Sequence, residues 1–242
     1  MGWDISYHPV ASEEIKSIYF RGLADPNFHE ELVARFGVDE FYAEQLKVRF
    51  EEARRIEQDV PFNKGHAFYA AIIFGFLRKY NYIRGGAFSF LADDPVFSPC
   101  VTDWRTLVPE DFKGLRFNNA LTENYCGGVF ISHDGLLRLR EMYEKEAHAK
   151  SALDENFSHG RLNVFWKAVD EALAEGCGLL EASEVIEPNP LDLNSSRCLS
   201  NLFNCHPDGA LLYAEAAMEQ LNEVVANQEP PKKKSWFARL FG

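Results

Sequence analysis

The sequence predicts a single α+β domain in which a small, mostly antiparallel sheet packs with about seven helices. Apolar residues recur with helical spacing in most segments, whereas a few short segments alternate, or follow glycine pairs, as strands do. Residues 1–228 contain no Pro-, Gly- or Ser-rich break that would separate two domains. The chain has 242 residues, 46% of them hydrophobic, which is enough for one large core. We therefore expect one domain over 1–228 and a flexible basic tail over 229–242.

The individual elements follow from local signals. Alternation of apolar and polar residues predicts a first strand, which Pro9 ends. Ser12 and Asp39 are suited to capping the first turn of a helix, and Gly37 is suited to closing one. Apolar runs led by glycine predict later strands. In chain order, we expect strands over 3–9, 87–91, 127–132 and 179–186, and helices over 12–23, 28–36, 39–59, 64–82, 134–147, 158–175 and 208–227.

One of these helices is expected to lie at the centre of the molecule. The segment Lys64–Tyr82 is apolar nearly all round, and such a helix is normally enclosed by other elements. We predict that it packs against a sheet containing the first strand, Ala87–Leu91 and Val129–Ile131. Phe76, with its apolar neighbours on the same helix, should then be almost fully buried.

The charge of the chain favours some partners over others. The net charge is −12, and residues 229–242 contain four basic residues and one acidic residue, so the rest of the chain carries −15. Such a surface repels nucleic acid and anionic membranes and attracts basic partners. The longest apolar run is about half the roughly 20 residues that a bilayer crossing needs, so we expect no stable membrane anchoring.

Nothing in the sequence predicts an enzyme, a cofactor or a metal site. Cys126 could pair with His133 or His159, but it opens an apolar strand, where a thiol is normally inert. Cys198 and Cys205 have no paired short spacing that completes a zinc ligand set. The five cysteines, an odd number, and the absence of a secretion signal at the start indicate reduced thiols and a cytoplasmic location.

Acidic residues in the predicted loops are candidates for contact with a partner protein. Pairs of acidic residues follow the predicted strand 87–91 and lie in the long connection after it, where one tryptophan stands beside an aspartate. Aromatic residues ringed by charge are typical of protein interfaces, although a core position for the tryptophan is equally compatible with the pattern. The predicted partner-binding residues are Asp93, Asp94, Asp103, Trp104, Glu110 and Asp111.

Two segments carry a resemblance to a known family. The stretch Met1–Val10 with the helix after it, and the strand-to-helix junction Tyr125–Ser132, resemble a family of bacterial immunity proteins. These proteins are encoded beside polymorphic or type VI secretion toxins that have a restriction-endonuclease-type nuclease domain. The resemblance covers the first quarter of the chain and the central junction, and it transfers no functional residue.

The resemblance implies a binding function. The expected role is an immunity protein that neutralises a cognate secreted nuclease toxin by stoichiometric protein–protein occlusion, either at the substrate channel or by preventing an active assembly. An acidic body is complementary to a nuclease that grips DNA with a basic groove. Two alternatives stay open at this point: an uncharacterised hydrolase, and an adaptor that recruits a partner through residues 229–242. The oligomeric state is not predicted.

Overall fold

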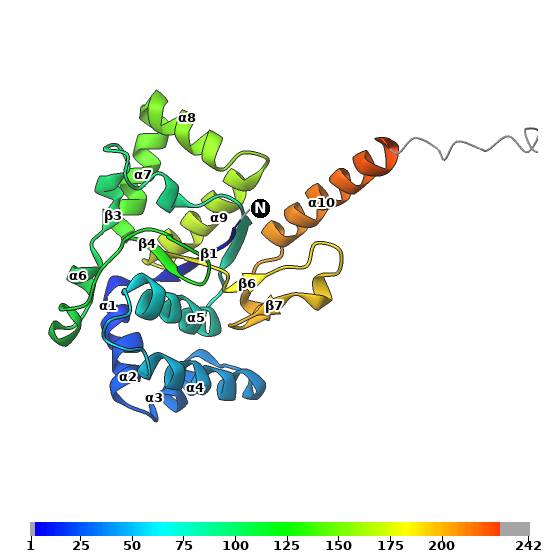
Figure 1. Ribbon diagram of the computed structural model, residues 1–242. Helices are drawn as coiled ribbons and strands as arrows, with labels where there is room; N and C mark the ends of the chain where they lie inside the picture. Colours follow the sequence, from blue (N-terminus) through cyan, green and yellow to red (C-terminus); the bar gives the residue numbers. More distant parts are fainter. Residues whose placement is uncertain (1–2, 228–242) are drawn as a thin grey trace, which may run out of the picture.

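A five-stranded antiparallel sheet lies at the centre of the computed structural model, which describes residues 3–227 (Figure 1). β1 and β5 pair along six residues and form the middle of the sheet, and the two-residue β3 is one of its edges. The strands, in the spatial order β2-β1-β5-β4-β3, are β2 Asn81–Arg84, β1 Asp4–Val10, β5 Gly178–Ser183, β4 Gly127–Ile131 and β3 Val101–Thr102. The α+β single-domain prediction is confirmed.

Helices cover both faces of this sheet. Because side chains alternate along a strand, Ile5 and Tyr7 of β1 point into one apolar cluster, and Val10 points into the other. All of β1 is buried, as expected for a strand between two helical layers. The short helix α1 (Ser12–Glu14) follows β1. The helices that contribute side chains to the first cluster are α2 Arg21–Ala24, α3 Phe28–Phe36, α4 Glu40–Arg54, α5 Phe68–Leu77 and α6 Trp104–Leu107; those of the second are α7 His133–Lys145, α8 Ala147–Asn156 and α9 Arg161–Ala174.

The first helical layer agrees closely with the predicted signals. Gly37 closes α3 with a left-handed φ of 64°, and the Asp39 carboxylate accepts a hydrogen bond from the backbone N–H of Phe41 at the start of α4. Helical segments with a wider turn, Ile15–Phe20 and Asn63–Ala67, continue α1 and precede α5. Every residue of α5 except the partly buried Tyr69 is buried, which confirms its predicted central place.

The end of the central helix was predicted wrongly. Arg78 is extended rather than helical, and its guanidinium reaches Glu14 at 2.5 Å, so the chain leaves α5 after Leu77. Residues 81 and 82, expected at the end of the helix, instead belong to β2, which pairs with β1. Pro9, expected to end the first strand, lies inside β1; β2 pairs only as far as Tyr7, and a proline is tolerated where one neighbour is missing.

The prediction of a strand over Ala87–Leu91 is also wrong, because backbone N–H groups of this segment donate hydrogen bonds to a side chain instead of to a neighbouring strand. It forms a 3₁₀ turn, Phe88–Phe90. The N–H of Phe88 donates to the carboxylate of Glu181 at 2.6 Å, and Tyr7 Oη donates to the same carboxylate at 2.9 Å. Burial raises the pKa of Glu181, and these donors act against that rise.

The second helical layer contains one helix, α8, that was not predicted from the sequence. Ser132 accepts a hydrogen bond from the Gly135 N–H and begins α7 near the predicted residue. α7 ends at Lys145 because Glu146 is extended, and α8 starts directly after it. α9 begins after Gly160 and closes the layer.

The last helix, α10 (Asp208–Asn227), has the predicted bounds and leaves the body of the molecule (Figure 1). Before it, β6 (Ile186–Glu187) and β7 (Arg197–Cys198) form a small separate hairpin. No helix formed by residues 3–227 combines the length and the apolar character that a bilayer crossing requires. The predicted tail, 229–242, lies outside the described residues.

Candidate partner-binding surface

Asp93 and Asp94 lie in a turn that faces α8. Asp93 is exposed, whereas Asp94 accepts hydrogen bonds from the N–H of Val96 and from Nε2 of His148, both at 2.8 Å. These two donors, the backbone N–H first, hold the pKa of Asp94 below its usual range. The Asp94 carboxylate is thus already engaged by two donors of its own chain, and the exposed Asp93 is the member of this predicted pair that is free to meet a partner.

Asp103 and Trp104 have separate roles. The exposed Asp103 caps the short helix α6 (Trp104–Leu107) by accepting a hydrogen bond from the N–H of Arg105. Trp104 is fully buried between the rings of Phe62 and Phe130. Its indole N–H donates to the Gly128 carbonyl at 3.3 Å. The prediction of Trp104 as a partner contact is therefore corrected: this residue belongs to the core, where its ring gains most from burial.

Glu110 and Asp111 start a 3₁₀ turn after α6, and both are exposed. Glu110 pairs with Lys113 at 2.7 Å, and Asp111 lines a pocket beside α2 and α4. Among the described residues, no hydrogen bond or ion pair connects this turn with Asp94 or Asp103. The five predicted acidic residues are thus on the surface or close to it, but the structure does not gather them into one charge cluster.

The pocket beside Asp111 is a feature that the sequence did not predict. It has a volume of about 630 Å³ and is lined by Phe20, Arg54, His66 and Phe112 among others. His66 Nδ1 shares a hydrogen bond of 2.8 Å with the buried hydroxyl of Tyr19. Burial lowers the pKa of His66 to about 4, so its imidazole is neutral at pH 7. The one signal in the sequence that could have pointed to this pocket is His66, a histidine inside the otherwise apolar segment 64–82.

The thiols that the sequence raised as catalytic or metal-binding candidates have other contacts. Cys126 is fully buried; its Sγ donates to the Glu123 carbonyl at 2.8 Å and lies near Ser183 Oγ. Cys198 Sγ lies 3.4 Å from the hydroxyl of Tyr80. Within residues 3–227, no group of three or more His, Cys, Asp or Glu side chains is arranged to hold a metal ion.

The base of α10 is fixed tightly to the edge strand β2. A Cβ atom at Gly209 would overlap the carbonyl oxygen of Tyr82, so only glycine permits this approach. Arg84 places its guanidinium over the ring of Tyr213, 4.9 Å from the ring centre. On the other side, Lys167 Nζ contacts Asp208 at 2.6 Å. Main-chain packing, a cation–π contact and an ion pair therefore set the direction of the helix.

Arg84 is itself held in place by a buried acidic group. Its Nη1 lies 2.5 Å from the Asp4 carboxylate, which also accepts a hydrogen bond from Tyr82. Glu184 lies beside Asp4, and its pKa is raised to about 7, first by burial and then by that neighbouring charge. The Arg84 guanidinium, which packs on Tyr213 of α10, is thus part of a network of charged groups that extends into the sheet.

Three carboxylates follow one another along α10. Glu215, Glu219 and Glu223 are spaced by four residues, so they lie along one side of the helix; we call them the acidic row. They line a groove of about 740 Å³ between α10 and the body, with Arg84 and Arg161 among the residues opposite. α10 contains no basic residue, and in the described residues its one ion pair to the body is that of Asp208.

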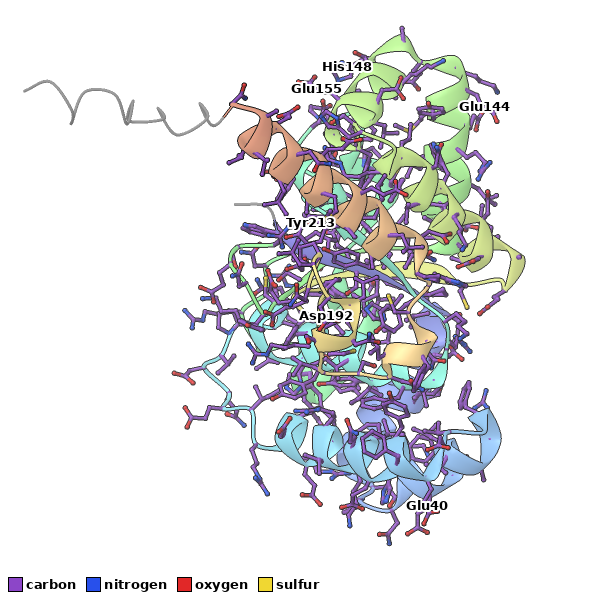
Figure 2. The ribbon with its side chains drawn as sticks, turned by 90° about the vertical axis from the view of Figure 1, so that its right-hand side faces the viewer. Glu40, Glu144, His148, Glu155, Asp192 and Tyr213 are labelled. Atoms are coloured by element: carbon purple, nitrogen blue, oxygen red, sulfur yellow. The ribbon has the colours of Figure 1, made fainter. Side chains whose placement is uncertain are left out.

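Like charges four residues apart destabilise a helix by a few tenths of a kcal/mol per pair. The acidic row therefore weakens the isolated helix, and a basic partner would remove that cost. Figure 2 shows that the face crossed by α10 carries further acidic residues from separate elements, including Glu40 of α4, Glu144 of α7 and Asp192 before β7. Acidic residues from several elements thus share this face with α10.

Comparisons of the chain with protein families, with curated proteins and with solved structures find no match.

Proposed function

We propose that this protein is an immunity protein that binds and neutralises a cognate secreted nuclease toxin in the cytoplasm. The observation that carries the proposal is the acidic surface: a net charge of −12, exposed carboxylates at Asp93, Asp103, Glu110 and Asp111, and the acidic row on a projecting helix. The resemblance of Met1–Val10 and Tyr125–Ser132 to immunity proteins supports the same function.

The proposed mechanism is occlusion by a stoichiometric complex. A nuclease must hold DNA phosphates with basic side chains. Carboxylates on a rigid scaffold can form ion pairs with those basic side chains in place of the phosphates. Complementary charge also speeds the association of the two proteins. The acidic row is suited to this role because its carboxylates are exposed on a projecting helix that carries no basic residue of its own. Two outcomes of binding are compatible with this mechanism: a blocked DNA channel, or a nuclease that cannot assemble.

The immunity function implies a nuclease toxin encoded beside the gene for this protein, and the test is inhibition of DNA cleavage by that nuclease domain. Purified nuclease is mixed with plasmid DNA and increasing amounts of this protein, and cleavage is followed on gels. We expect cleavage to stop at about one molecule of this protein per nuclease, because occlusion is stoichiometric. A non-cognate nuclease of another fold, at the same concentrations, should remain active.

Two further measurements separate the alternatives. A variant that lacks residues 229–242 should inhibit as well as the full chain, whereas an adaptor that uses this segment would lose its function. Inhibition at amounts well below the nuclease concentration would instead indicate a hydrolase that acts on the toxin. If the full chain neither binds nor inhibits the neighbouring nuclease, the immunity function is wrong.

A further inference from the structure

The side of α10 away from the acidic row is apolar, and no other part of residues 3–227 covers it. Its large side chains are between 43% and 67% exposed, whereas the exposed large apolar side chains of the other helices, such as Phe41 of α4 and Leu137 of α7, do not form such a row. The α10 residues form a continuous set with spacings of three and four, which places them along one side of a helix. We call this set the α10 stripe: Leu211, Ala214, Met218, Leu221, Val224 and Val225.

The stripe and the acidic row occupy different sides of the same helix. At about 100° per residue, the row falls between the side that faces the body and the edge of the stripe. Gly209, which is buried against β2, marks the side that faces the body. A partner that covers the stripe therefore meets the acidic row along one border, and the charge that matches this border is positive.

α10 is also ready to bind without rearrangement. Contacts at Asp208, Gly209 and Tyr213 fix its base, and about 14 further residues extend beyond them, or about 20 Å of helix. A helix that is already formed and directed loses less conformational entropy on binding than one that must fold. The exposed position of the stripe is thus accompanied by a fixed orientation.

We propose that α10 docks into an apolar groove of the nuclease toxin, and that this groove carries basic side chains along the rim next to the acidic row. This proposal rests on the proposed function and adds the binding element and the character of the surface that receives it. The recognition is that of an amphipathic helix in a groove, with Met218, Leu221 and Val225 as anchors spaced by three and four residues. Charge favours the toxin over a second copy of this chain, since a second α10 brings only acidic residues.

The experiment measures the affinity and the association rate of variants for the nuclease domain encoded beside this gene. In the first variant, Leu221→Gln and Val225→Gln remove two anchors but keep side chains that favour a helix. We expect at least about a 30-fold weaker Kd, mainly through faster dissociation. The matched control, Leu137→Gln with Val48→Gln, changes exposed apolar residues of α7 and α4 and should leave the Kd unchanged.

A second variant tests the rim. Glu219→Lys with Glu223→Lys should slow association about tenfold at low salt, and the difference should shrink as salt rises. Circular dichroism and the unfolding midpoint of each variant show that the fold is retained, because the altered residues are exposed.

The outcomes separate this inference from the function on which it rests. If the native protein binds the nuclease and the α10 variants bind equally well, the docking role of α10 is wrong and the immunity function stands. If sedimentation shows a dimer that the Leu221/Val225 variant converts to a monomer, with nuclease binding unchanged, the stripe is a contact between copies and the proposal is overturned. If the native protein does not bind the nuclease, both are wrong.

Discussion

At the scale of single residues, the buried His66 makes stability depend on pH. Burial lowers its pKa from 6.5 to about 4, so the folded state keeps the imidazole neutral while the unfolded state protonates it. The stability that this neutral side chain supports is present above pH 6.5 and is lost as pH falls toward 4. Across that window the loss approaches 1.4 kcal/mol per pH unit, because one proton binds the unfolded state preferentially.

Glu184 acts in the opposite direction, because its pKa is raised to about 7 and its folded form binds a proton first. The prediction is therefore a difference between variants. His66→Gln should make the free energy of unfolding fall less steeply between pH 6 and pH 4.5, by about 1 kcal/mol per pH unit, in urea titrations at several pH values. His29→Gln, whose ring bonds the Pro26 carbonyl, is the control. Equal pH profiles for all three proteins would show that His66 is not held neutral.

Residue-level signals in the sequence were accurate where they act locally. Gly37 and Asp39 could be identified because a left-handed helix end and an N-cap need only their own backbone. The place of Trp104 could not be identified in this way, because tryptophan is common both at interfaces and in cores. Its burial depends on packing against Phe62 and Phe130, which are distant along the chain. Asp94 is similar, since its partner His148 comes from a helix that the sequence did not reveal.

At the scale of elements, α5 is the helix on which the two-layer packing depends. Phe76 is 1% exposed and contacts the ring of Tyr42 on α4. Phe76→Ala should lower the free energy of unfolding by about 3–5 kcal/mol, because a large cavity remains in a layer that cannot collapse around it. Chemical denaturation measures the change. Phe41→Ala on α4, where the ring is 68% exposed, should cost far less. A loss under about 1 kcal/mol for Phe76→Ala would contradict the central place of α5.

The elements that the sequence missed share a physical cause. β2 was hidden at the end of the apolar segment 64–82, because periodicity does not separate a buried helix from a buried strand. The segment 87–91 has the composition of a strand, yet the N–H groups of Phe88 and Ser89 donate to Glu181, which lies 93 and 92 residues further along the chain. Both errors concern hydrogen-bond partners from distant parts of the chain, whereas helices with their own caps were placed to within a few residues.

At the scale of the whole molecule, charge should govern the rate at which the proposed complex forms. Association with the nuclease should slow about tenfold when salt rises from low to physiological concentrations or above, because exposed charges are screened. Asp93→Lys with Asp94→Lys should slow it further, without unfolding the protein. Stopped-flow kinetics at several salt concentrations measures both effects.

A control with the same change in net charge shows whether the position matters. Glu57→Lys with Asp59→Lys alters two exposed residues after α4. If both reversed pairs slow association equally, total charge alone steers the encounter. If neither has an effect and salt has none, the electrostatic part of the proposed mechanism is wrong. The charge that motivates this test could be counted from the sequence, whereas the projection of α10 could not, because it depends on the contact of Gly209 with β2.

That contact has a geometric consequence. Because α10 is one uninterrupted helix from its anchored base, the direction of every side chain beyond Tyr213 is set by a count of residues from Gly209. One alanine inserted after Tyr213 would rotate Leu221 by about 100° about the helix axis, with no native residue replaced and no change in the buried core. Four inserted alanines would return it to within about 40° of its first direction, but about 6 Å farther from the body. The proposed docking therefore predicts that binding depends on the number of residues between Gly209 and the stripe as well as on their identity.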